Sequence, residues 1–387
     1  MQGLAGRVLV VDDVEMNRDV LARRLRQQGH AVATAENGRR ALEMLAAEEF
    51  DLVLLDIMMP ELDGFQVLER LRQDEALRHV PVIMISAVDE MPSVVRAIEL
   101  GAADYLPKPF NAVLLKARVG ATLEKKRLAD AERLHARSLE RELEIGRQIQ
   151  ASFLPEELPQ PTGWEIAASF YPARKVGGDF YDAFLLPRRS RLGLAVSDVC
   201  DKGVGAALFM AVFRSLIRTA IERDDEAGAE AAASVEAAVA HNSDYIARTH
   251  GKANMFATLF LGLLDLESGA LTYVNAGHEP PVVRRESGAL SRLPPTGPAV
   301  GLLPGLRFRV EMTSLARGDL LLAFTDGVSE ARNSAGGLYG EGRLLGLLEE
   351  PASATALLSR IEGSLQAHTA GGEPSDDVTM LAVRRTE

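Results

Sequence analysis

One proline-free stretch, Asn111 to Leu154, constrains the fold of this chain more than any other feature. It lies between Pro109 and Pro155, and its residue pattern predicts a single long helix. At a rise of about 1.5 Å per residue the helix would be roughly 65 Å long, which exceeds the width of a small domain. A helix of this length must project from the flanking domains or pair with another helix.

Apolar residues follow a narrow stripe along this predicted helix. They are Leu115, Val119, Leu123, Leu134, Leu139, Leu143, Ile149 and Phe153. A narrow stripe surrounded by charged residues is typical of a coiled coil, so we expect residues 111–154 to be a coiled-coil linker that forms a homodimer. The alternative is a solvated spacer helix without a partner. Gly120 and Gly146 are positions where the helix could kink.

Length and composition indicate two ordinary folded domains joined by this linker. The 387 residues exceed one typical core, and 47 % hydrophobic and 25 % charged residues are average for globular proteins. A net charge of −12 argues against nucleic acid as a partner. Apolar runs such as residues 255–264 are too short to cross a bilayer, and the first residues enter a strand without room for a signal peptide. We therefore expect no membrane association and a cytoplasmic location, in which the single cysteine, Cys200, is reduced.

The first domain, residues 1–120, is predicted to be an α/β doubly wound parallel sheet. Short apolar runs alternate with helical patterns, and these runs read RVLVVD, HAVATA, DLVLLDIMM, VPVIMISA and ADYLPKP. In such a sheet, functional groups gather at the carboxyl ends of the strands.

Acidic residues, a serine and a lysine stand at these strand ends. Asp12 and Asp13 end the first run, Asp56 ends the third, Ser86 the fourth, and Lys108 lies in the fifth. Three converging carboxylates repel one another unless a hard cation such as Mg²⁺ lies among them. With Asp56 as nucleophile, and with Lys108 and Ser86 holding phosphoryl oxygens, the set would transfer a phosphoryl group to a carboxylate. A lone aspartate at a strand end is usually a turn former, but so many at adjacent strand ends favour a site.

The segments VVDD, LLDIMMPELDG, MISA and YLPKPF resemble the receiver domain of bacterial response regulators. The resemblance implies that Asp56 is phosphorylated by a sensor histidine kinase. It also implies that Asp13, Asp56 and the Met58 carbonyl hold Mg²⁺, and that Asp12 supports the ion through water.

The resemblance further implies that Ser86 and Tyr105 change position on phosphorylation, and that the Lys108–Pro109 peptide bond is cis. The alternative for Tyr105 is a packed aromatic residue of the core.

The last domain, residues 155–387, is predicted to be an α+β sandwich of antiparallel sheets. Hairpin-like turns separate strand patterns that read EIAASFYPA, LGLAVSDV, ANMFATLFLGLLDL, GALTYVNAG, PPVVRRESG, LLLAFTDG and VTMLAVRR. Asp179, Asp198, Asp326 and Asp376 border apolar strands and stand near tight-turn residues. Such a set suits two hard divalent cations, which can activate water and hold phosphoryl oxygens.

The segments PARKVGGDFYD, SDVCDKGVGAALFMA, NAGHEPP, TDGVSEARN and DDVTML resemble the SpoIIE type of metal-dependent PPM protein phosphatases. This implies that Asp179, Asp198, Asp326, Asp376 and the Val199 carbonyl bind two Mn²⁺ or Mg²⁺ ions. The implied substrate is a phosphoserine or phosphothreonine protein, typically an antagonist of an anti-sigma factor. Together the two resemblances imply a phosphatase that the receiver domain controls through the linker.

Several roles stay open at this point. Asp182 and Asp201 are turn-forming or supporting residues, and His278 is either a general acid or a structural residue. Cys200 is interpreted as a small packed residue rather than a nucleophile, because no catalytic motif with a His or Lys includes it. No arginine can be assigned to the substrate phosphate. Alternative functions are a non-catalytic adaptor for a sigma factor or antagonist, and a phosphatase acting on a nucleotide or small phosphate.

Overall fold

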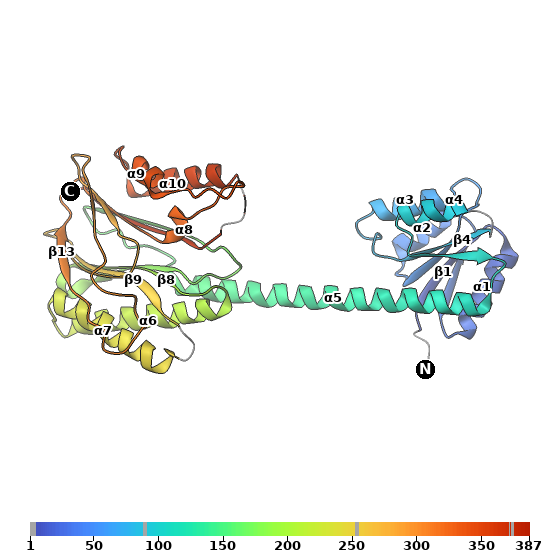
Figure 1. Cartoon of the computed structure of the whole chain (residues 1–387), viewed down its shortest axis with the longest axis horizontal. Coiled ribbons are helices and arrows are strands. Elements are labelled where there is room, and N and C mark those ends of the chain that lie inside the picture. Colours follow the sequence, from blue (N-terminus) through green and yellow to red (C-terminus); the bar gives the residue numbers. More distant parts are fainter. Residues whose placement is uncertain (1–4, 88–90, 252–254, 371, 373–374) are drawn as a thin grey trace. The chain divides into compact units, whose positions relative to one another are not determined.

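The computed structural model describes residues 5–87, 91–251, 255–370, 372 and 375–387 (Figure 1). The chain forms two compact units, Met1–Leu139 and Glu140–Glu387. One helix, α5 (Ala112–Phe153), continues from the first unit into the second. The prediction of one long helix is therefore confirmed, and the helix is not interrupted at Gly120 or Gly146.

The first unit has the predicted parallel sheet, with strands in the order β2-β1-β3-β4-β5. Its strands are β1 (Arg7–Val11), β2 (Ala31–Ala35), β3 (Leu52–Asp56), β4 (Val82–Ala87) and β5 (Asp104–Lys108), and its other helices are α1 (Glu15–Gln27), α2 (Gly38–Ala47), α3 (Gly64–Gln73) and α4 (Met91–Glu99). Alternate residues of β1 point to opposite faces: Leu9 and Val11 pack with α2 and α3, and Val8 and Val10 with α1 and α5. Every strand thus brings its carboxyl end to one edge.

The first turns of α5 belong to the core of this unit. Leu115, Val119 and Leu123 are buried in the cluster that also contains Val8 and Val10. The prediction that the whole apolar stripe faces a second helix in a coiled coil was therefore wrong for these three residues, because they pack on the sheet of the first unit. Beyond them the apolar side chains reach solvent, and Leu134 is 66 % exposed.

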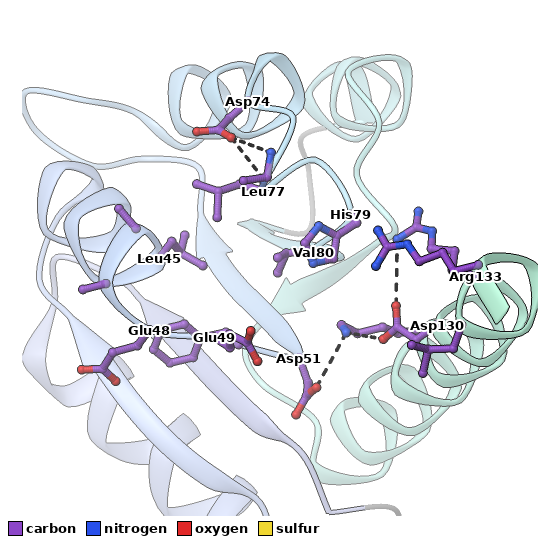
Figure 2. Close-up of a pocket in the computed structure, with 17 residues that line it drawn as sticks. Leu45, Glu48, Glu49, Asp51, Asp74, Leu77, His79, Val80, Asp130 and Arg133 are labelled. Atoms are coloured by element: carbon purple, nitrogen blue, oxygen red, sulfur yellow. Dashed lines mark hydrogen bonds and ion pairs between the residues drawn. The ribbon is translucent and has the colours of Figure 1, made fainter. Parts of the chain in front are cut away.

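A cavity of about 790 Å³ lies between α5 and the end of β3 that is remote from Asp56 (Figure 2). Lys126 of α5 forms ion pairs with Asp51, just before β3, and with Asp130 one helical turn further on. Arg133 in turn lies 3.9 Å from Asp130. These ion pairs tie the part of α5 that leaves the core to the base of the sheet.

The second unit is a sandwich of two five-stranded antiparallel sheets, as predicted. One sheet has the order β13-β10-β9-β8-β7 and the other β12-β11-β14-β15-β6. The strands are β6 (Trp164–Tyr171), β7 (Phe180–Leu186), β8 (Arg191–Val199), β9 (Ala257–Asp265), β10 (Ala270–Ala276), β11 (Val282–Arg284), β12 (Leu290–Arg292), β13 (Glu311–Ser314), β14 (Leu320–Phe324) and β15 (Val378–Arg385). The sequence patterns did not predict β7, β12 or β13 as separate strands.

Helices cover the outer faces of the sandwich (Figure 1). They are α6 (Val204–Glu226) and α7 (Ala231–Thr249) on the first sheet, and α9 (Glu341–Leu347) and α10 (Ala354–Thr369) on the second, with the single turn α8 (Asp326–Ser329) after β14. Among the described helices, α6 alone has the length and apolar composition that a membrane span requires. Its Met210, Phe213 and Ile217 are buried in the core of the unit, as expected of a core helix.

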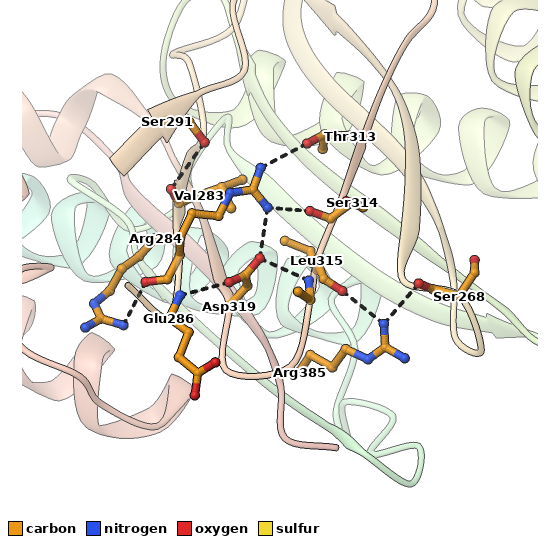
Figure 3. A network of polar contacts seen from close by, with 12 residues as sticks. Ser268, Val283, Arg284, Glu286, Ser291, Thr313, Ser314, Leu315, Asp319 and Arg385 are labelled. Atoms are coloured by element: carbon orange, nitrogen blue, oxygen red, sulfur yellow. Dashed lines mark hydrogen bonds and ion pairs between the residues drawn. The ribbon is translucent and has the colours of Figure 1, made fainter. Parts of the chain in front are cut away.

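A buried carboxylate connects the two sheets at one end of the sandwich (Figure 3). Asp319, just before β14, accepts hydrogen bonds from Arg285 at 2.8 Å and from the backbone N–H groups of Glu286 and Ala316 at 2.9 and 3.0 Å. Arg285 also donates to the carbonyl oxygen of Ser314 in β13, which belongs to the other sheet. Asp319 thus orients the side chain that bridges the sheets.

Replacing Asp319 by alanine is expected to lower the free energy of unfolding of the second unit by about 2–4 kcal/mol, because two backbone N–H donors and a guanidinium lose a buried acceptor. Fluorescence of Trp164 during urea denaturation measures this, since it is the only tryptophan in the chain and is buried in this unit. The control is Arg317→Ala, an exposed neighbour expected to change stability by at most about 0.5 kcal/mol. Equal effects of the two substitutions would contradict the bridging role.

Candidate functional site

Three aspartates meet at the carboxyl edge of the parallel sheet. Asp12 and Asp13 follow β1, Asp56 ends β3, and one carboxylate oxygen of each lies within 4.8 Å of the other two. Lys108 at the end of β5 places its Nζ 2.9 Å from Asp56 Oδ1 and 3.0 Å from Asp12 Oδ2. Close packing behind the site requires Gly64, because a Cβ there would lie 2.2 Å from the Asp56 carbonyl oxygen. The structure therefore brings these predicted residues together.

Burial raises the pKa of Asp56 to about 6, and the neighbouring charges of Asp12 and Asp13 act in the same direction, whereas Lys108 opposes them. One ammonium group does not fully offset three carboxylates in this partly buried place. The oxygen donors present fit a hard divalent cation, which would stabilise the ionised form of Asp56.

The remaining receiver residues lie near this edge. The buried Ser86 hydroxyl, on β4 next to β3, has no hydrogen-bond partner within the part of the chain that the structure describes. The ring of Tyr105 is covered by the guanidinium of Arg118 from α5, at 4.7 Å, and Arg118 pairs with Asp104. The Met58 side chain, just after β3, is exposed. The Lys108–Pro109 peptide bond is cis, as the resemblance implied.

A second acidic site lies in the sandwich, where four chain segments meet. Asp179 precedes β7, Asp198 lies in β8, Asp326 starts α8, and Asp376 precedes β15. Burial raises the pKa of Asp198 to about 7, and the charge of Asp326 adds to this shift, although a hydrogen bond with Asp179 opposes it. Burial and then Asp198 raise the pKa of Asp179 well above its usual value, and burial and then Asp376 raise that of Asp326.

Because the charges of these aspartates raise the pKa of their neighbours, the four carboxylates lie close enough to repel one another. No three of them approach within 4.8 Å as the receiver carboxylates do. These carboxylate oxygens are more widely spaced than those of the receiver unit, and their negative charges are largely unpaired. Such a set fits divalent cations bound among the four aspartates. The Val199 carbonyl oxygen is beside this site, 3.0 Å from where a Cβ on Gly178 would stand.

Two neighbouring residues hold Asp179 and its loop in place. Thr379 donates a hydrogen bond of 2.7 Å to Asp179 Oδ2. The carboxylate of Asp377 accepts from the backbone N–H groups of Ala173 at 2.7 Å and Gly178 at 2.6 Å. The Asp377 carboxylate is thus occupied by the backbone before Asp179, which favours the adjacent Asp376 as the ligand.

Lys202 is a residue of this site that the sequence reasoning missed. Its Nζ lies 2.8 Å from Asp376 Oδ2 and donates to the Ser375 carbonyl oxygen at 2.9 Å. The only signal in the sequence was its place in the DKG turn. Asp201 in the same turn has a φ of 73° and accepts from the Lys202 N–H, which favours the turn-forming role for Asp201.

Three other open roles also acquire a structural explanation. Asp182 is buried and forms an ion pair of 2.9 Å with Arg214 of α6. His278 is buried, its Nδ1 lies 2.8 Å from Thr258 Oγ1, and burial lowers its pKa to about 3, so it is uncharged at neutral pH. The Cys200 sulfur accepts a hydrogen bond from a backbone N–H, and burial raises the pKa of the thiol. These environments favour structural roles over catalytic ones.

The last turns of α5 contact the loop that carries Asp179. Gln150 is only 5 % exposed, its Nε2 donates to the Gly177 carbonyl oxygen at 2.5 Å, and its Oε1 accepts from the Gly177 N–H at 3.0 Å. Gly177 is two residues before Asp179, and a Cβ there would lie 2.5 Å from Asp377 Oδ2. Sequence reasoning missed Gln150, because a glutamine in a polar helix carries no distinctive signal.

Comparison with known families agrees with both sites. The model of the response regulator receiver domain matches residues 8–120, and that of stage II sporulation protein E (SpoIIE) matches residues 188–386. The chain therefore combines a receiver domain with a phosphatase domain of the PP2C type. Because the second match covers more than half of its length, the chain belongs to the SpoIIE family. Both resemblances predicted from the motifs are thereby confirmed.

Individual relatives each match part of the chain. Protein IcfG of Synechocystis sp. is 43 % identical over 263 residues, which are 63 % of this chain and 41 % of IcfG. Response regulator PleD of Caulobacter vibrioides is 43 % identical over 116 residues, 30 % of this chain and 26 % of PleD. The chain thus spans less than half the length of these relatives. The SiaA-PP2C domain of Pseudomonas aeruginosa superposes with a TM-score of 0.55 at 20 % identity, over 65 % of this chain and 98 % of that domain, which shows a common fold.

Replacing the exposed Asp13 by alanine is expected to weaken Mg²⁺ binding to the receiver unit by about tenfold or more, because one of three converging oxygen donors is lost. Isothermal titration of the full chain carrying Asp326→Asn, which is designed to weaken binding at the second site, measures the remaining receiver site. Asp19→Ala, which removes another exposed carboxylate on α1, is the control. Unchanged Mg²⁺ affinity in Asp13→Ala would exclude Asp13 as a ligand.

Proposed function

We propose that this protein is a response regulator in which phosphorylation of Asp56 by a sensor histidine kinase controls a metal-dependent protein-serine/threonine phosphatase. The observation that carries the proposal is the meeting of four partly or fully buried aspartates from separate segments of the SpoIIE-type domain. Clustered carboxylates with raised pKa values are costly to maintain, which supports a role as cation ligands.

In the receiver unit, Asp56 would accept the phosphoryl group as nucleophile. Asp12, Asp13 and the Met58 carbonyl, together with Asp56, would hold Mg²⁺, which neutralises charge on the phosphoryl oxygens. Lys108 is already 2.9 Å from Asp56 and can bind a phosphoryl oxygen, and the unpartnered Ser86 hydroxyl can donate to another.

In the phosphatase unit, Asp179, Asp198, Asp326, Asp376 and the Val199 carbonyl would hold two Mn²⁺ or Mg²⁺ ions. When bound, such ions lower the pKa of water and neutralise the phosphate ester. Thr379 fixes the orientation of Asp179 through its hydrogen bond, and Lys202 does the same for Asp376. Asp377 keeps the glycine loop before Asp179 close to the site.

The proposed substrate is a phosphorylated protein, and the family resemblance favours an antagonist of an anti-sigma factor. The proposed assembly is a homodimer through α5. Its support is the row of solvent-exposed apolar side chains on α5, which includes Leu134, Leu139 and Ile149. Pairing with a second α5 would remove these side chains from water.

Control by the receiver predicts that beryllium fluoride, which mimics a phosphoryl group on Asp56, changes the rate at which the full chain dephosphorylates a phosphoserine protein in the presence of Mn²⁺. Asp56→Asn should abolish this change. Asp326→Asn should abolish the Mn²⁺-dependent turnover itself while Trp164 fluorescence reports an intact fold. Equal rates with and without beryllium fluoride would contradict control by the receiver, and full activity of Asp326→Asn would contradict the ligand assignment.

The hydrogen bonds of Gln150 predict a direct effect of α5 on the metal site. Gln150→Ala leaves the buried N–H and carbonyl groups of Gly177 without partners, and should lower Mn²⁺ affinity about tenfold and increase hydrogen exchange at the Gly177 and Gly178 amides. The matched control is Gln148→Ala, an exposed glutamine half a turn away. Identical Mn²⁺ affinity and exchange in the two variants would show that Gln150 does not position the loop.

A further inference from the structure

A cavity of about 380 Å³ lies in the phosphatase unit and has no part in the chemistry described above. It is enclosed by the end of β6, the turn α8, the last turns of α10 and the start of β15. Its walls include the apolar side chains of Ala331, Leu365 and Val378, all largely buried, and the ring of Tyr171. This volume lies at the small end of the range for ligand sites, roughly 300–1,000 Å³.

The cavity adjoins two of the chain segments that carry the proposed metal ligands. Gly327 and Ser375 line the cavity, and they are the direct neighbours of the proposed ligands Asp326 and Asp376. The two segments touch, since a Cβ on Gly327 would lie 1.9 Å from the Asp377 carbonyl oxygen. An extended peptide advances about 3.3 Å per residue, so a residue within three positions of a phosphoserine held at the aspartates can reach this neighbourhood.

The chemistry of the lining selects the kind of group that can enter. Glu362 is the one charged residue among those that line the cavity in the described part of the chain, and its carboxylate accepts a hydrogen bond from the Tyr171 hydroxyl. No Lys or Arg is among the described residues that line the cavity, and the neighbouring Lys202 is already paired with Asp376. Glu362 would repel an acidic group, whereas an apolar side chain would be removed from water.

We infer that this cavity is a substrate subsite that accepts one apolar side chain located within three residues of the phosphorylated serine or threonine. The inference rests on the proposed phosphatase function and adds a sequence preference to it. The occupant is a single side chain of the substrate polypeptide. A helix with its side chains is about 10–12 Å wide, which is too large for a cavity of about 380 Å³.

The test compares synthetic phosphoserine heptapeptides of glycine and alanine that carry one leucine or one aspartate at each position from −3 to +3. The full chain with Mn²⁺ is expected to hydrolyse the peptide with leucine at one of these positions with a kcat/KM at least about tenfold above that of its glycine counterpart, since the leucine side chain leaves water on entering the cavity. Aspartate at the same position should lower kcat/KM below the glycine value.

Two variants on the last turn of α10 locate this preference. Thr369 lines the cavity and is partly exposed, so Thr369→Trp fills the space without entering the core, and the leucine-to-glycine ratio should fall to about one. Ala367→Trp adds the same bulk at an exposed position outside the cavity and should retain the ratio. A ratio near one in the unmodified chain, or an unchanged ratio in Thr369→Trp, would overturn the subsite. Failure to hydrolyse every phosphopeptide and p-nitrophenyl phosphate would instead overturn the proposed function, and the subsite with it.

Discussion

The phosphatase unit depends on holding several carboxylates close together against their mutual repulsion. The two sheets make this possible, because Asp179 and Asp198 belong to segments of one sheet and Asp326 and Asp376 to segments of the other. Apolar side chains packed between the sheets, such as Val196, Phe260 and Leu381, fix the separation of the strand ends. Burial then raises the pKa of Asp179, Asp198 and Asp326, so the packing of the core maintains an arrangement that is unfavourable for the ionised carboxylates by themselves.

The two acidic centres differ in how much of their negative charge is balanced by positively charged side chains. In the receiver unit Lys108 contacts both Asp12 and Asp56, so a mobile ion has less charge to offset. In the phosphatase unit Lys202 is ion-paired only with Asp376, and the other carboxylates are steadied by hydrogen bonds that carry no charge, as from Thr379 to Asp179. Each centre thus contains one lysine ammonium group, against three carboxylates in the receiver unit and four in the phosphatase unit.

Sequence patterns predicted the parallel sheet, the long helix and the sandwich, because these depend on local periodicity and on turn residues. They also identified the aspartates, since each stands beside an apolar strand. They missed β7, although glycines precede its run FYDAFLL and Pro187 follows it. They also failed for Leu115 and its neighbours, because the spacing of apolar residues on a helix does not show which surface they cover. The roles of Gln150 and Lys202 depend on segments distant in sequence, and only the folded chain separates Asp377, which holds backbone, from the adjacent Asp376.

In the proposed control of the phosphatase by the receiver, any signal would have to pass along α5, which is one continuous helix. Near its start, Arg118 covers the ring of Tyr105, while Leu115 and Val119 keep the same turns buried against the sheet. A movement of Tyr105 would therefore change the packing of Arg118 without releasing the helix from the receiver core. Near its end, Gln150 holds the backbone of Gly177 through two hydrogen bonds, so a shift or rotation of the last turns cannot occur without moving the loop that carries Asp179 or breaking both bonds. Coupling of this kind needs an element with two arrangements that both sites bias, and a helix fixed at both ends by specific polar contacts meets the mechanical part of that requirement.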